Sequence, residues 1–103
     1  MTVFQVKVED VAATMNKLKA EGLVRFVGLS ECTPDELRRF HLVCPVTCVQ
    51  MEYSLGCREI EHDVLPCARQ LGVSVVAYSP LARGLLAGLN VKELHPSDWR
   101  QVV

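Results

Sequence analysis

The sequence predicts an α/β fold made of parallel strand–helix units. Short apolar runs rich in β-branched residues begin near Val24, Val46 and Val73, at intervals of 22 and 27 residues, and a helical segment fills each interval. Strands joined through a single helix run parallel, and parallel strands read as continuously apolar because helices cover the sheet. Three such units fit either a doubly wound sheet or part of an eight-stranded (β/α)8 barrel, which as a whole needs about 250 residues.

The composition is that of a globular α/β protein. The 103 residues are 50% hydrophobic and carry a formal net charge of −1, so the chain is one small domain or part of a larger one. This charge gives no electrostatic basis for binding nucleic acid, and no basic tract indicates an anionic membrane surface. We expect no signal peptide and no membrane span, because no apolar run approaches the ~18 residues that a span needs.

The five cysteines form no C-x-x-C pair, and the three histidines do not repeat at metal-ligand spacing. We therefore expect reduced thiols, no metal and a cytoplasmic protein; a zinc site or a disulfide framework is the alternative.

The first helix is expected over Val8–Glu21. Apolar residues recur there at steps of four and three and so share one face: Val11, Met15 and Leu18. Gly22 follows as the C-terminal cap, since glycine tolerates a left-handed backbone. The next residues, Leu23–Leu29, are dense in Leu, Val and Phe and predict the first strand.

The second helix has the clearest start in the sequence. Thr33 can cap the helix, Pro34 suits its first position, and Glu36 completes a capping box. The helix is expected to end near Val43, because Pro45 cannot continue it.

The second strand is expected over Val46–Met51 and the third helix over Glu59–Leu71. Pro66 lies inside that helix and predicts either a kink or a short turn followed by a helix that restarts near the proline. Gly72 is the expected cap, and Val73–Ala77 is the expected third strand.

The third strand leads into a loop that carries Gly84 and Gly88, and the chain ends in a turn-like segment where Ser97 could cap a last short helix. In parallel α/β folds the carboxyl ends of the strands open onto one face, where ligands bind.

Three of the expected strand ends carry polar or aromatic side chains that suit one kind of ligand. Ser30 and Gln50 can pair with an amide, the Tyr78 ring can stack on a heterocycle, and N–H groups of the following loop can hold a phosphate. The pattern favours a planar, amide-bearing, phosphate-linked ligand. Loop polar groups that merely cap the backbone remain the alternative.

Four blocks of the chain resemble consecutive segments of the aldo-keto reductase family, in the family's order and spacing. They are GLVRFVGLS (Gly22–Ser30), VQMEYSL (Val49–Leu55), VLPCARQLG (Val64–Gly72) and VAYSPLARGLLAG (Val76–Gly88). The resemblance covers about residues 8–88 of a single partial domain over 1–103. It implies an aldo-keto reductase-type TIM barrel, a (β/α)8 fold that reduces aldehydes and ketones with NADP(H), and assigns the three strands as its fifth, sixth and seventh.

The resemblance implies roles for three strand-end residues. Ser30 and Gln50 match positions that hydrogen-bond the nicotinamide carboxamide, and Tyr78 matches the aromatic residue that stacks on the nicotinamide ring. Glu31 departs from the family's frequent Asn, and we leave it out of the expected cofactor site because a carboxylate cannot donate to the carboxamide oxygen.

The loop after Tyr78 matches the family's pyrophosphate loop, with Ser79, Leu81 and Gly84 as its cofactor-binding residues. Arg83 lies in the same loop, where a solvated side chain is expected over a phosphate contact.

The catalytic residues of the family, a Tyr assisted by Lys, Asp and His, match nothing in this chain. Tyr53 lies in the EYSL turn, and His41 and His62 fall in expected helices. The leading hypothesis is therefore a fragment of an oxidoreductase whose complete form acts on a small-molecule carbonyl substrate. A non-catalytic nucleotide-binding or assembly module and a truncated product without activity are the alternatives.

Two expected strands would have unpaired edges in such a fragment. Exposed apolar edges favour association with other strands, so we expect an isolated chain that is marginally stable or self-associates.

Overall fold

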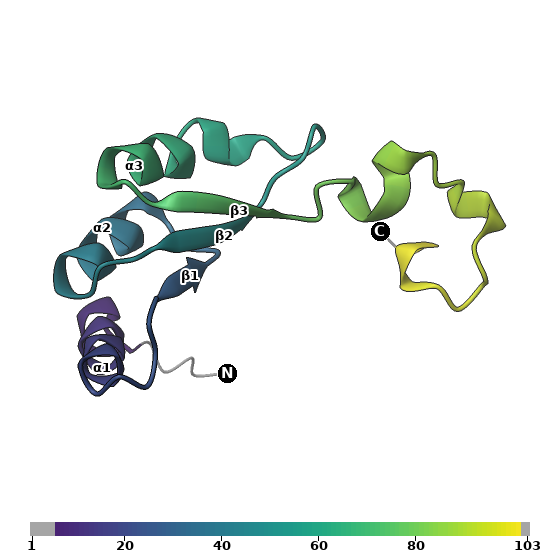
Figure 1. The fold of residues 1–103 in the computed structure, drawn as a ribbon. Helices are drawn as coiled ribbons and strands as arrows, with labels where there is room; N and C mark the ends of the chain where they lie inside the picture. The colour runs from purple at the N-terminus through teal and green to yellow at the C-terminus, as the bar shows by residue number, and fades with distance from the viewer. Residues whose placement is uncertain (1–5, 102–103) are drawn as a thin grey trace.

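The computed structural model describes residues 6–101 and contains one sheet of three parallel strands (Figure 1). The strands, in their spatial order, are β1 (Gly28–Ser30), β2 (Cys48–Glu52) and β3 (Ser74–Tyr78). One α-helix precedes each strand: α1 (Val8–Ala20), α2 (Pro34–Val43) and α3 (Val64–Leu71). The predicted α/β fold with parallel strand–helix units is confirmed.

The helices cover one face of the sheet and leave the other open. Along β2, Val49 and Met51 are buried, whereas Cys48, Gln50 and Glu52 are not. Successive side chains of a strand point to opposite faces, so the buried pair faces the helices. Helix α2 packs between α1 and α3 (Figure 1), and the core includes buried residues from all three helices: Ala12, Leu37, Phe40, Val64, Cys67 and Ala68.

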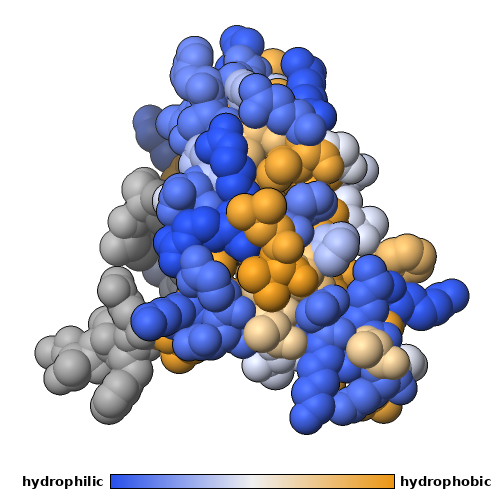
Figure 2. All heavy atoms as spheres, turned by 90° about the vertical axis from the view of Figure 1, so that its left-hand side faces the viewer, coloured by the Kyte–Doolittle hydropathy of each residue, from blue (hydrophilic) through white to orange (hydrophobic). Residues whose placement is uncertain are grey.

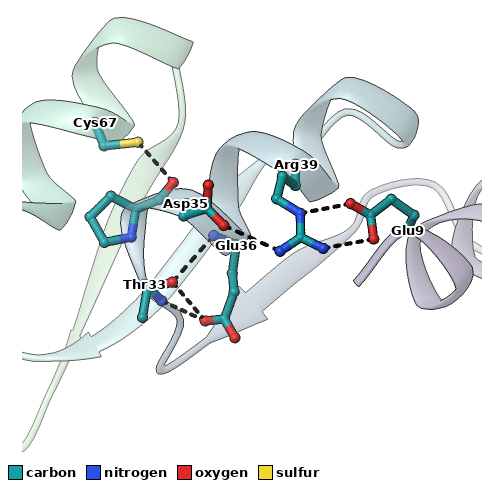
Figure 3. A network of polar contacts seen from close by, with 7 residues as sticks. Glu9, Thr33, Asp35, Glu36, Arg39 and Cys67 are labelled. Atoms are coloured by element: carbon teal, nitrogen blue, oxygen red, sulfur yellow. Dashed lines mark hydrogen bonds and ion pairs between the residues drawn. The ribbon is translucent and has the colours of Figure 1, made fainter. Parts of the chain in front are cut away.

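Helix α2 begins as the sequence predicts. The Glu36 N–H donates to the Thr33 hydroxyl at 3.2 Å, and the Thr33 N–H donates to the Glu36 carboxylate at 2.8 Å, which completes the capping box (Figure 3). Arg39 then joins α2 to α1 through two hydrogen bonds to Glu9, of 2.7 and 2.8 Å. The predicted end at Val43 is also confirmed.

The buried face of α1 differs from the one predicted. Val11 is 40% exposed, while Ala12 is fully buried and Val8 and Met15 pack against the core. The stripe of Val8, Ala12 and Met15 has the same steps of four and three residues as the predicted one, but it begins three residues earlier. Helix α1 packs against α2, and a small residue at the buried position 12 allows the helix to approach its neighbour closely.

The first strand is shorter than predicted. Residues 23–27 form no strand, and Leu23 and Phe26 are 69% and 70% exposed. A strand exists only where a neighbour completes its ladder, and β1 pairs with β2 over Gly28–Ser30 alone. The other two strands lie one or two residues later than predicted.

The region around Pro66 forms a short turn followed by a new helix, which is the second of the two predicted arrangements. A short 3-10 turn, η1 (Glu59–Glu61), precedes α3, which begins after Asp63. Pro66 then occupies the third helical position, where an N–H would have no partner within the helix. Gly72 ends α3 with a left-handed φ of 69°, as expected.

The segment after β3 contains three 3-10 turns and extends beyond the carboxyl ends of the strands (Figure 1). The turns are η2 (Ala82–Ala87), η3 (Val91–Glu93) and η4 (Trp99–Gln101). The prediction that Ser97 caps the last helical turn is wrong. Asp98 is the residue immediately before η4, and its side chain accepts the hydrogen bond from the Arg100 N–H at 2.9 Å.

The opposite end of the molecule carries an apolar patch framed by hydrophilic side chains (Figure 2).

Among residues 6–101, each helix is too short or too polar to cross a membrane.

Candidate functional site

The open face of the sheet brings the predicted strand-end residues together. Ser30 pairs in register with Gln50, and Gln50 pairs with Val76 on β3. Two residues further along the strands, Glu52 pairs with Tyr78. Paired residues of neighbouring strands share a face, so Ser30, Gln50 and Tyr78 all lie on the side that the helices leave uncovered.

Ser30 and Gln50 are both exposed on this face. Their backbones are already part of the ladder, and the Gln50 carbonyl accepts from the Glu31 N–H at 3.0 Å. The side-chain hydroxyl and amide supply both donors and acceptors. They are therefore suited to hold a planar amide above the sheet.

Tyr78 ends β3 and is half-buried. Its carbonyl accepts from the Tyr53 N–H at 3.3 Å, which continues the ladder beyond β2. The nearby Glu31 carboxylate, together with partial burial, raises the pKa of the Tyr78 hydroxyl. A phenol with a raised pKa stays protonated at neutral pH, which suits a stacking role better than that of a proton donor.

The loop after β3 is held in an unusual backbone conformation. Ser79, Ala82 and Arg83 have left-handed φ angles of 48°, 49° and 57° without being glycine. Gly84 has a φ of 101°, and a Cβ there would lie 3.5 Å from Leu89. Such conformations cost energy and occur most often where a loop has a binding role.

Some of the N–H groups in this loop are used by the loop itself. The Ala82 N–H donates to the Ser79 carbonyl at 2.9 Å, and the Gly84 N–H donates to the Leu81 carbonyl at 3.0 Å. Leu81 is 55% exposed. Gly84 therefore contributes to the loop through its backbone conformation, while its N–H is committed to a turn.

Glu31 has a structural role that sequence reasoning missed. It has a left-handed φ of 49°, and its carboxylate accepts from the Glu52 N–H at 3.0 Å. It thus joins the ends of β1 and β2 at the rim of the open face. The departure from the family's Asn was visible in the sequence, but the backbone partner was not.

The Arg83 side chain is exposed, as the sequence suggests, but it also forms an ion pair that the sequence does not indicate. Its guanidinium Nη1 lies 2.9 Å from the Glu52 Oε1, and its Cζ lies 6.0 Å from the centre of the Trp99 ring. The two residues of the ion pair are 31 positions apart in the sequence. No local signal could have revealed this pairing.

The tyrosine in the EYSL turn is tied to a structural network. The Tyr53 hydroxyl donates to the Glu61 carboxylate at 2.7 Å, which raises the pKa of Tyr53, and Arg58 holds the same carboxylate at 2.8 Å. Across residues 6–101, no three His, Cys, Asp or Glu side chains are grouped to hold a metal ion.

The sequence profile of the aldo/keto reductase family matches residues 2–102. The chain belongs to the aldo/keto reductase family. It is 44% identical over 93 residues to a probable aldo-keto reductase of Glycine max, an alignment that covers 90% of this chain and 27% of that protein.

Solved structures of the family share the fold. A glycerol dehydrogenase from Gluconobacter oxydans matches with a TM-score of 0.86 and 33% identity over 96% of this chain and 31% of its own. An aldo/keto reductase from Klebsiella pneumoniae, solved with NADP and acetate, matches with a TM-score of 0.71 and 30% identity over 84% of this chain and 34% of its own. This aldo/keto reductase chain therefore spans about a third or less of the length of these relatives, and its sheet is part of a TIM-barrel-type fold.

Proposed function

We propose that this chain is the nicotinamide-binding part of an NADP(H)-dependent oxidoreductase that reduces aldehydes or ketones to alcohols. The observation that carries the proposal is the shared open face of Ser30, Gln50 and Tyr78. It places an amide-pairing group and an aromatic ring on neighbouring strands, as a nicotinamide carboxamide and its ring require. The Klebsiella pneumoniae relative, solved with NADP, supports this choice of cofactor.

The three residues fit the nicotinamide end of the cofactor chemically. Ser30 and Gln50 offer hydrogen-bond donors and acceptors with exposed side chains. The protonated Tyr78 ring offers an apolar face for stacking. The bound cofactor would supply the hydride, and these residues would bind and orient the nicotinamide ring. The loop residues Ser79, Leu81 and Gly84 would then line the path of the pyrophosphate.

Catalysis would need groups outside the described residues. Within residues 6–101, Tyr53 is bonded to Glu61 and Tyr78 lies in the stacking position. We therefore infer that residues 6–101 bind cofactor without reducing carbonyl compounds. Steady NADPH oxidation with a nitrobenzaldehyde by the pure chain would contradict this part of the proposal.

The binding role can be tested by NMR saturation transfer from the chain to NADP⁺, a method that detects weak binding. We expect saturation of the nicotinamide protons and its marked loss in Tyr78→Ala, because aromatic stacking on a base contributes about 1–3 kcal/mol. Tyr78→Phe is the matched control and should retain the signal, since it keeps the ring. Equal saturation in the Ala variant would reject the stacking role.

The open sheet face also supports the assembly alternative. Val76 is 44% exposed there, and in the described chain β1 and β3 each pair on one side only. We infer that further strand–helix units pair with the free edges of β1 and β3, from the same polypeptide or from another chain. Size-exclusion chromatography of the pure chain should then show self-association, and a monodisperse monomer with a steep urea transition would count against it.

A further inference from the structure

The segment after β3 is tied to the sheet by a side-chain ion pair. Arg83 Nη1 lies 2.9 Å from Glu52 Oε1, and the side chains are 43% and 29% exposed, respectively. Arg83 belongs to η2, whereas Glu52 is the last residue of β2. The pair therefore joins the loop of the expected phosphate site to the rim of the expected nicotinamide site.

Both partners are held in place by further contacts. The Arg83 guanidinium lies over the Trp99 ring, with 6.0 Å from its Cζ to the ring centre, and the Arg83 carbonyl accepts from Arg100 Nη1 at 3.5 Å. On the other side, the Glu52 N–H donates to the Glu31 carboxylate at 3.0 Å. A continuous series of contacts thus runs from the end of β1 to η4.

The left-handed backbone of the loop needs surrounding contacts to hold it. Ser79, Ala82 and Arg83 each occupy a conformation that L-residues rarely adopt, and the segment from Ser79 to Gln101 has no buried residue. Strained residues persist only where surrounding contacts hold them. Because no residue of the segment is fully buried, that support comes from the backbone hydrogen bonds within the loop and from the contacts that the Arg83 side chain makes with Glu52 and Trp99.

We propose that Glu52 and Arg83 are positioning residues, whose ion pair holds the loop Ser79–Gly84 against the end of the sheet for the phosphates of a dinucleotide. The inference rests on the proposed function, because it concerns the same cofactor. In this proposal the Arg83 guanidinium contacts the protein and not the cofactor. It orients the loop, and the loop binds the phosphates.

The competing assignment, in which Arg83 binds phosphate directly, predicts the opposite result for one substitution. Glu52→Gln removes the negative partner of Arg83. If Arg83 positions the loop, NADP⁺ binds more weakly, by about threefold for a partly exposed ion pair. If Arg83 is a phosphate ligand, the substitution frees the guanidinium and NADP⁺ binds more tightly.

The experiment compares the wild-type chain with Glu52→Gln, Arg83→Gln and the exchanged pair Glu52→Arg/Arg83→Glu. Glu9→Gln is the matched control, because it breaks a similarly exposed ion pair with Arg39 between α1 and α2. Hydrogen exchange of the amides in residues 81–101 and the fluorescence of Trp99, the one tryptophan of the chain, are measured without ligand. NADP⁺ saturation transfer is measured in parallel.

We expect faster exchange in residues 81–101 and weaker NADP⁺ binding in both single variants, partial recovery of both in the exchanged pair, and no such change in Glu9→Gln. Unchanged exchange in Glu52→Gln and Arg83→Gln, or tighter NADP⁺ binding in Glu52→Gln, would overturn the proposal. If exchange responds as expected but the wild-type chain does not bind NADP⁺, the ion pair keeps its positioning role and the proposed function fails.

Discussion

The strand–helix part of the chain, residues 8–78, and the segment 79–101 are stabilised in different ways. The buried core residues all lie between Ala12 and Val73. The segment contributes none, and four of its large apolar side chains are 44–58% exposed: Leu81, Leu85, Leu86 and Trp99. Burial of apolar area is the main stabilising term in folding, so the first part is held by its core and the second by polar contacts and local turns.

The backbone shows the same contrast. Four non-glycine residues within 6–101 have a left-handed φ: Ser79, Ala82 and Arg83 lie in or just before η2, and Glu31 follows β1. All four are at the carboxyl-end rim of the sheet or in the loop that leaves it. Regions with few buried contacts open at low free-energy cost. The candidate site therefore combines strand ends that are held by the packed core with a loop, residues 79–84, that can adapt to a ligand.

The largest expected effect is on the packed part. Leu37, in α2, is fully buried, and Leu37→Ala should lower the free energy of unfolding by about 3 kcal/mol, since truncation of a core leucine leaves a cavity. Leu85→Ala is the matched control in the segment, where the leucine is 57% exposed. Urea denaturation measures both, and similar losses in the two variants would contradict the contrast between the regions.

An intermediate effect is expected at the close approach of β1 and β2. A Cβ on Gly28 would lie 2.9 Å from the Cys48 Sγ and 3.2 Å from the Cys48 carbonyl oxygen. Gly28→Ala should therefore destabilise the chain by about 1–3 kcal/mol through overpacking.

Adding Cys48→Ala removes the sulfur and should recover part of this loss, which a double-mutant cycle in urea would detect. Additive losses would show that the sulfur is not what excludes a side chain at position 28.

The smallest expected effect concerns the ion pair between α1 and α2. Hydrogen bonds from Arg39 lower the pKa of Glu9 from 4.5 to about 2. A carboxylate with a lowered pKa in the folded state stabilises the fold above its unfolded pKa and loses this effect as the pH falls. Glu9→Gln should thus be slightly less stable than the wild-type chain at pH 7, and the difference should shrink between pH 4.5 and 2. A difference in urea midpoint that does not change over this range would reject the role of Glu9.

Local features were predictable where one short stretch contains all the groups that interact. The Thr33–Glu36 capping box, the glycine cap at Gly72 and the restart of the helix near Pro66 all depend on residues a few positions apart. The strand-end residues Ser30 and Gln50 were predictable in a different way. Parallel order alone places the carboxyl ends of strands on one rim, and the register then brings the two side chains together.

Other features depend on partners that are far apart in the sequence. The helical spacing of α1 was correct, but its buried face was decided by packing against α2. The apolar run 23–29 has strand composition, yet only the part that meets β2 became a strand.

The sequence by itself determined the strand–helix order, the start of α2, the glycine cap of α3 and the candidate residues at the strand ends, because these follow from local propensity, spacing and order along the chain. The tertiary structure alone decided which face of the sheet stays open, how far β1 extends, and that Arg83 is paired with Glu52. Each of these is a contact between distant segments, and its energy depends on three-dimensional proximity that no local pattern encodes.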